Sequence, residues 1–236
     1  MSWSMYEPIQ TLQPQPPNIL GTQPHQFAAK PPVNQSPEAN QVQVPEPGTK
    51  PSKWADISDY GEIQDWVYIV FAVLLVDILV LFLIRFFPAF FGKSINVWYN
   101  RFKLNAVIAD VGIIVIGFAV ARYIYSEYIY PTYDWNALYF TLTTVLTQIV
   151  HDIGFYFGVV RPIPAGHNAM IDIFKMYGEE VGVKAIASDS AMMMASSGLA
   201  MLLKSAPPHI TALVGMIGIY IVPYLLETRN QYSVIS

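Results

Sequence analysis

The sequence contains no cysteine among its 236 residues. This absence excludes disulfide bonds, thiol catalysis, palmitoylation and cysteine-ligated metal sites. Charge is also scarce, because Asp, Glu, Lys and Arg together make up 13% of the chain, whereas a soluble domain usually has about a quarter. The net charge of −4 gives no reason to expect a nucleic-acid partner. The composition therefore argues against an ordinary soluble domain.

Several motifs that carry chemistry are missing as well. The first 30 residues lack a charged stretch followed by an apolar one, so we expect no cleavable signal peptide and expect the first membrane helix to direct insertion. No phosphate-binding glycine loop is present. Ser196-Ser197-Gly198 has no histidine near it in sequence and is interpreted as packing residues. We predict that the protein is not an enzyme and has no cofactor and no metal site.

Long apolar blocks are what the sequence does contain. Hydrophobic residues make up 53% of the chain, and the first block, residues 66–87, has only Asp77 and Arg85 as charged residues. About 20 mostly apolar residues are enough for a helix to cross the ~30 Å hydrocarbon core of a bilayer. The blocks predict an all-α transmembrane bundle of four or five spans. These spans lie at about residues 66–87, 104–124, 135–160, 183–203 and 210–226.

Two parts of this bundle are less regular. The block at 183–203 is the doubtful span, because it contains Lys184 and Asp189. Residues 168–181 have an amphipathic pattern typical of a short helix at the membrane interface. Small residues at four-residue spacing in the doubtful block predict a surface that another helix can approach closely. These residues are Ala187, Ala191 and Ala195, followed by Gly198.

Residues 1–65 form a separate region, the N-terminal arm. Ten of its first fifty residues are proline and eight are glutamine. Proline disfavours helix and central strand, so we expect polyproline II or irregular extended chain. Such a composition is typical of a disordered tail, but an extended arm can also gain order by lying along neighbouring proteins. Its candidate anchors are Trp3, Tyr6, Ile9, Leu12, Ile19, Leu20 and Phe27.

The distribution of Lys and Arg predicts an orientation. If all five spans cross, the first and third connectors lie on one side of the membrane and carry most of the cationic residues outside the arm. Cytoplasmic connectors are enriched in Lys and Arg. The arm is therefore expected on the side opposite the first connector.

Ionisable residues inside membrane spans are candidates for function. On one face of the third block, Gln148 and Asp152 lie in line with Tyr156. A proton path, an ion site or a metal site are possible uses of these groups. The alternative is a structural role, in which these polar groups form hydrogen bonds between helices and fix the register of the bundle. The predicted intramembrane polar cluster consists of Asp77, Asp110, Gln148, His151, Asp152 and Asp189.

Residues 148–203 also carry a pattern that resembles a known family. The pattern begins Gln148-Ile-Val-His151-Asp152-Ile-Gly-Phe-Tyr156-Phe and continues through Arg161-Pro-Ile-Pro164, Gly166-His-Asn168, Ile171-Asp172, Phe174-Lys175 and Ser188-Asp189-Ser190-Ala-Met192-Met193. It is similar to a multispan membrane protein family of large icosahedral DNA viruses, including those that infect chlorella-type algae. The resemblance implies a minor capsid protein in the virion inner membrane, inserted into host endomembranes during assembly, with no catalytic residues.

Three hypotheses follow. The first is a structural membrane protein of a large DNA virus, with the lipid bilayer, the major and minor capsid proteins and other copies of itself as partners. Extended at about 3.1 Å per residue, 60 residues of arm would reach on the order of 180 Å from the membrane. The second is a transporter, channel or proton-coupled enzyme that uses the buried Asp and His residues. The third is an adaptor whose Pro14-Gln15-Pro16-Pro17 segment binds SH3- or WW-type domains.

Overall fold

A computed structural model describes residues 54–229, and every described regular element is helical. The candidate anchors of the arm, and the segment proposed to bind SH3 or WW domains, lie outside the described residues. The seven α-helices are α1 (Asp65–Phe86), α2 (Lys93–Phe102), α3 (Leu104–Ile124), α4 (Ala137–Phe155), α5 (Ala169–Val181), α6 (Val183–Ser205) and α7 (Pro208–Glu227). Three short helical segments are η1 (Pro88–Phe90), η2 (Tyr125–Ile129), which continues α3, and η3 (Tyr156–Val160), which continues α4.

The predicted all-α multispan architecture is confirmed. Among the described residues, four helices are long and apolar enough to cross a membrane: α1, α3 with η2, α6 and α7. Residues 183–203, the doubtful span, lie in α6, which qualifies as a candidate span by its length and composition. The helix that does not qualify is α4, in the predicted span 135–160. Its threonines, together with Gln148, His151 and Asp152, make it less apolar than the others.

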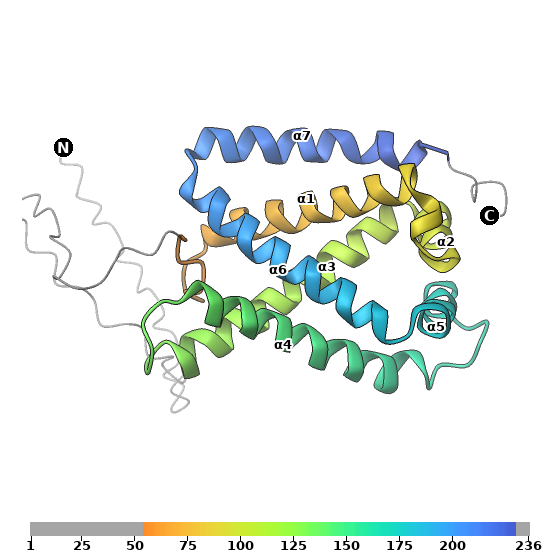
Figure 1. Ribbon diagram of the computed structural model, residues 1–236, viewed down its shortest axis with the longest axis horizontal. Helices are drawn as coiled ribbons and strands as arrows, with labels where there is room; N and C mark the ends of the chain where they lie inside the picture. Colours follow the sequence, from red (N-terminus) through yellow and green to blue (C-terminus); the bar gives the residue numbers. More distant parts are fainter. Residues whose placement is uncertain (1–53, 230–236) are drawn as a thin grey trace, which may run out of the picture. The chain divides into compact units, whose positions relative to one another are not determined.

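The long helices run between two ends of the bundle (Figure 1). Residues 54–64, which we call the linker, lie at one end, and α2 and α5 lie at the other (Figure 1). Helix α1 is central and packs against α3, α6 and α7. The linker and the first connector are thus at opposite ends of the bundle, joined by α1.

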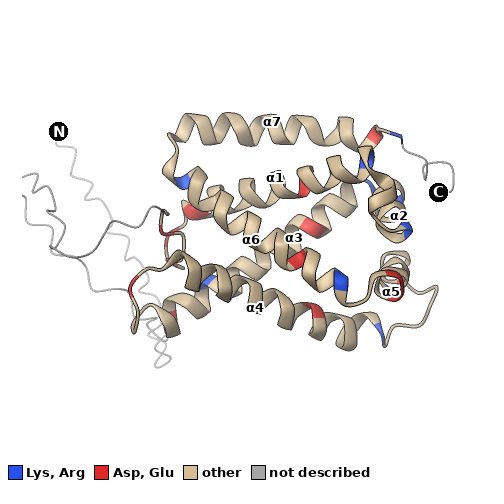
Figure 2. Ribbon diagram, viewed as in Figure 1, with Lys and Arg blue, Asp and Glu red and all other residues tan. Residues whose placement is uncertain are grey.

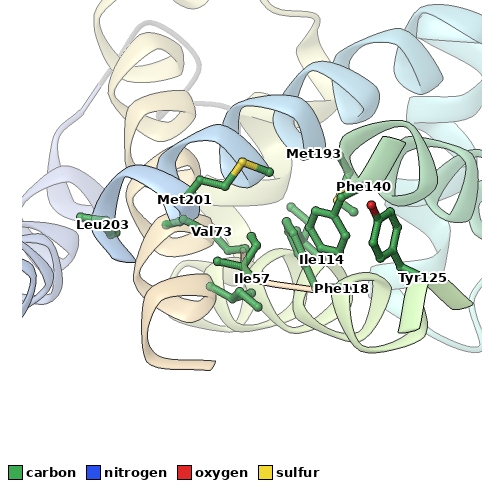
Figure 3. Packing of buried hydrophobic residues seen from close by; sticks show 12 residues of the cluster. Ile57, Val73, Ile114, Phe118, Tyr125, Phe140, Met193, Met201 and Leu203 are labelled. Atoms are coloured by element: carbon green, nitrogen blue, oxygen red, sulfur yellow. The ribbon is translucent and has the colours of Figure 1, made fainter. Parts of the chain in front are cut away.

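The core of the bundle has two hydrophobic clusters. The cluster at the linker end contains Ile57, whose side chain is fully buried, together with residues of α1, α3, α4 and α6. Figure 3 shows the ring of Phe140 next to that of Tyr125, and their centroids are 5.4 Å apart. The second cluster joins α1, α2, α3, α5 and α7 around Trp98 and Tyr99. The linker is therefore part of the packed core rather than a free tether.

Helix α2 was not predicted from the sequence. Residues 88–103 were interpreted only as a connector with basic residues, and the structure corrects this. Trp98 and Tyr99 are 3% and 1% exposed, while Arg101 lies on the exposed side. This amphipathic pattern buries the aromatic residues against α1, α3 and α5. The pattern was present in the sequence but was hidden by the short length of the segment and by its charge.

The predicted amphipathic helix at 168–181 is present as α5, and its last turn caps α2. The Glu180 carboxylate accepts hydrogen bonds from the backbone N–H groups of Lys93 and Ser94, at 2.6 and 2.7 Å. A carboxylate at a helix N-terminus satisfies free donors and interacts favourably with the helix dipole. Burial alone would raise the pKa of Glu180, but these hydrogen bonds outweigh it and lower the pKa below 4.5.

Replacing Glu180 with glutamine is expected to lower the free energy of unfolding by about 0.5–1 kcal/mol at neutral pH. Because the pKa is lowered in the folded state, the stabilisation is present above pH 4.5 and is lost as the pH falls through the lower folded value. Thermal unfolding in detergent at a series of pH values measures this difference. If the difference in stability between the native protein and the Glu180→Gln variant persists unchanged in strong acid, the capping role is contradicted.

The small-residue stripe of α6 does not meet another helix within the described residues. Ala187, Ala191 and Ala195 are exposed, whereas the buried face of α6 contains Met193 and Ser197. A close approach between helices is made by α7 instead. A Cβ atom added at Gly215 would lie 2.5 Å from the ring of Phe71 in α1.

Replacing Gly215 with valine is expected to destabilise the protein by about 1–3 kcal/mol, because Phe71 would have to move and α7 would separate from α1. The matched control is Gly154→Val in α4, where an added Cβ meets nothing within 4 Å. Thermal unfolding of both variants in the same detergent measures the difference. Equal losses at the two glycines would show that the α1–α7 contact is not tight.

Candidate functional site

The linker is held to the bundle by hydrogen bonds from η2 and from the segment just before α4. Ser126 in η2 donates to the carbonyl of Ser58 at 2.8 Å and accepts from the N–H of Tyr60. Trp135 donates its indole N–H to the carbonyl of Trp54 at 3.0 Å. These contacts fix the backbone of a segment that has no regular secondary structure before α1.

A buried ion network reinforces this attachment. Asp65 and Arg122 have fully buried side chains and form an ion pair at 3.4 Å between α1 and α3. Lys204 of α6 forms a second ion pair with Asp65 at 2.5 Å. The guanidinium of Arg122 also lies over the ring of Trp66, 4.6 Å from its centroid. Three helices thus meet at one carboxylate.

The same two cations bind the linker directly. Arg122 donates to the backbone carbonyls of Asp59 and Glu62. Lys204 donates to the carbonyl of Asp56 at 2.6 Å. Buried charges are tolerated only when they are paired and hydrogen-bonded. The buried cations of the network therefore depend on the backbone carbonyls of the linker as hydrogen-bond partners. In turn, the linker is held against the bundle by these hydrogen bonds.

The sequence analysis did not predict this network. The predicted boundary between the arm and the bundle lay after Asp65, which separated this carboxylate from Arg122 and Lys204. A cation near the end of a span can reach water, so neither residue stands out in the sequence. The signal that could have identified them is their position at the C-terminal ends of α3 and α6, at the end of the bundle next to the linker.

The predicted polar cluster forms two adjoining groups. In the first, Tyr99 of α2 donates to Asp77 of α1 at 2.9 Å, and Trp98 donates its indole N–H to Asp110 of α3 at 2.9 Å. Burial and the two carboxyls hold the pKa of Tyr99 well above its usual value, so its hydroxyl remains a neutral donor. The partners of these acids come from α2, which was not predicted as a helix.

The second group lies between α4 and α6. Gln148 donates to Asp152 at 2.5 Å, and His151 Nδ1 lies 3.3 Å from the same carboxylate. Asp189 of α6 interacts electrostatically with Asp152 and with Asp110 of the first group. We call the four aspartates on α1, α3, α4 and α6 the acidic cluster, because each lies close enough to another of them for their charges to interact.

Apart from His151 beside Asp152, the acidic cluster has no basic side chain in an ion pair with it within the part of the chain that the structure describes. No lysine or arginine there forms an ion pair with Asp77, Asp110, Asp152 or Asp189. Figure 2 shows acidic positions along the middle of the long helices, with Lys and Arg toward the helix ends. Like charges that share a buried site disfavour full ionisation. The chemistry available to this cluster is therefore the holding of protons.

The arrangement does not form a metal site. No group of three or more His, Asp or Glu side chains within residues 54–229 has a geometry that could hold a metal ion. His151 instead stacks on Phe155, with ring centroids 5.6 Å apart. The predicted residues meet, but as hydrogen-bonded pairs rather than as a set of converging ligands.

The helices with enough length and apolar character make this chain a candidate multi-pass integral membrane protein, for which a lipid bilayer is a plausible partner. Comparison with known proteins adds no family assignment: no family model, no curated protein and no solved structure matches the chain.

Proposed function

We propose that the protein is a structural membrane component of a large DNA virus particle, and that its N-terminal arm connects the inner membrane to the capsid shell. The observation that carries the proposal is the docking of the linker onto the bundle by Arg122 and Lys204. A tether must transmit force from the bound arm to the membrane anchor. A linker held by buried ion pairs does this better than a flexible joint.

The viral setting comes from the resemblance of residues 148–203, and the structure supports the mechanical part of the proposal. The linker lies at the end of the bundle opposite α2 and α5 (Figure 1). In this proposal, residues 1–53 extend from the linker at one membrane face. The proline-rich composition of this segment favours an extended conformation that binds along a neighbouring surface.

A deletion of residues 1–53 tests the proposal. It keeps Trp54, whose carbonyl accepts the hydrogen bond from Trp135, so the linker remains packed. The shortened protein is expected to resist carbonate extraction from membranes as the full chain does, and to be lost from assembled particles. If the deletion variant enters particles at the normal level and cross-links to the shell, the arm is not the tether.

A second candidate function is proton-coupled transport, and the convergence of the acidic cluster favours it. Vesicles that contain the purified protein and an internal pH-sensitive dye would report proton movement. The hypothesis expects flux that Asp110→Asn and Asp189→Asn both abolish, while Glu179→Gln, at an exposed position of α5, leaves it intact. Equal dye responses in protein-containing and empty vesicles would reject this function.

A further inference from the structure

A groove on the outside of the bundle has the properties of a lipid site. Its volume is about 670 Å³, and it lies between α3 and α7. These two helices each pack against α1 but make few contacts with each other. Leu74 of α1 therefore lines the groove between them, and Gly112 of α3 leaves it open, because an added Cβ would meet nothing within 4 Å.

The walls of the groove match an acyl chain. Apart from two residues at one end, the lining side chains are apolar, among them Val107, Ile108 and Val222. Helices α1, α3 and α7 are all candidate membrane spans, so the groove opens toward hydrocarbon. Pro223 also lines the groove with its apolar ring. Water has few polar partners along these walls, whereas a lipid tail contacts their apolar side chains.

The exception to the apolar lining is an ion pair at one end. Lys103 and Glu227 lie 2.7 Å apart, with side chains 50% and 68% exposed. Lys103 separates α2 from α3, and Glu227 is the last residue of α7, so both stand where a span ends. Lys103 has a φ of 48°, the only positive φ of a described non-glycine residue. Such backbone strain is retained where the surroundings fix a side chain in place.

We propose that this groove binds one zwitterionic glycerophospholipid. Its acyl chain lies along α3 and α7, its phosphate pairs with Lys103, and its ammonium group pairs with Glu227. In the protein, the ammonium of Lys103 lies next to the carboxylate of Glu227, and in the lipid headgroup the phosphate lies next to the ammonium. Each protein charge therefore faces a lipid charge of the opposite sign. An anionic lipid would satisfy Lys103 but would place its negative charge beside Glu227. The inference requires only that the helices cross the membrane, and it is independent of the arm.

The test is native mass spectrometry of the full chain taken from nanodiscs with equal parts of phosphatidylethanolamine, phosphatidylcholine and phosphatidylglycerol. We expect one retained lipid per protein, drawn from the two zwitterionic classes. Gly112→Leu fills the groove and should abolish retention, whereas Gly154→Leu, at an equally open glycine on α4, should not. Lys103→Gln with Glu227→Gln should lower the preference for zwitterionic lipid about tenfold, since both exposed ion pairs with the lipid headgroup are lost.

The outcomes separate the possible occupants. A protein that retains phosphatidylglycerol, or no lipid at all, would overturn the proposal. Equal retention by the Gly112 and Gly154 variants would place the bound lipid elsewhere on the surface. A dimer whose formation is blocked by Gly112→Leu would show that a second copy fills the groove. The variant lacking residues 1–53 should retain the same lipid, so failure of the tether hypothesis leaves this result unchanged.

Discussion

Replacing Arg122 with methionine is expected to lower the free energy of unfolding by about 3–5 kcal/mol. The substitution leaves the fully buried carboxylate of Asp65 with Lys204 as its remaining cation. It also removes the donor that binds the carbonyls of Asp59 and Glu62. Thermal unfolding of the purified protein in detergent measures the loss of stability.

A local measurement can distinguish loss of the linker from general destabilisation. The chain has no cysteine, so Ser58→Cys introduces a unique thiol at a position that is 1% exposed. Its labelling by a maleimide should become faster in the Arg122→Met protein at temperatures below unfolding. The control is Lys103→Met, which removes an exposed ion pair and should cost less than about 1 kcal/mol. Slow labelling and unchanged stability in the Arg122 variant would contradict the role of the network.

Removing the hydroxyl of Tyr99 is expected to cost about 1–3 kcal/mol. Tyr99 is 1% exposed, and its hydroxyl donates to Asp77, whose own side chain is fully buried. The other carboxylate oxygen of Asp77 has no hydrogen-bond partner among the described residues. Tyr99→Phe therefore leaves a buried polar group without its donor.

The double variant Tyr99→Phe/Asp77→Leu should be more stable than Tyr99→Phe alone. Replacing both members of a buried polar pair by apolar groups is often nearly neutral, whereas removing one leaves the other unsatisfied. Thermal unfolding of the two single variants and the double variant forms a double-mutant cycle. Additive losses would show that the two side chains do not interact.

The positions of the long helices could be predicted from the sequence because hydrophobic length alone fixes them. The predicted 66–87 span became α1 at Asp65–Phe86, and the predicted 104–124 span became α3 at Leu104–Ile124. Helix α2 was missed because a ten-residue amphipathic segment in a charged connector has no such length signature. The charged residues Lys184 and Asp189 led to the doubt about α6, although α4, with its threonines, is the helix that is not apolar enough to qualify as a span.

The polar residues of the bundle were identified by type, but their partners were not. Asp77 and Asp110 stand out as acids within apolar blocks. Their donors, Tyr99 and Trp98, come from α2 and are ordinary interfacial aromatics in the sequence. Arg122 and Asp65 are 57 residues apart, and no local pattern connects them. Pairings of this kind depend on how helices pack, and this cannot be derived from the periodicity of each helix.

The most direct test of the account uses the absence of native cysteine to attach a photo-cross-linker at single positions. Leu20→Cys places it in the arm, and Ala191→Cys places it on the exposed face of α6. In purified particles, the account predicts that position 20 cross-links to a shell protein and that position 191 cross-links to lipid or to another copy of this chain. Cross-links from position 20 only to lipid or to the bundle itself would contradict the account.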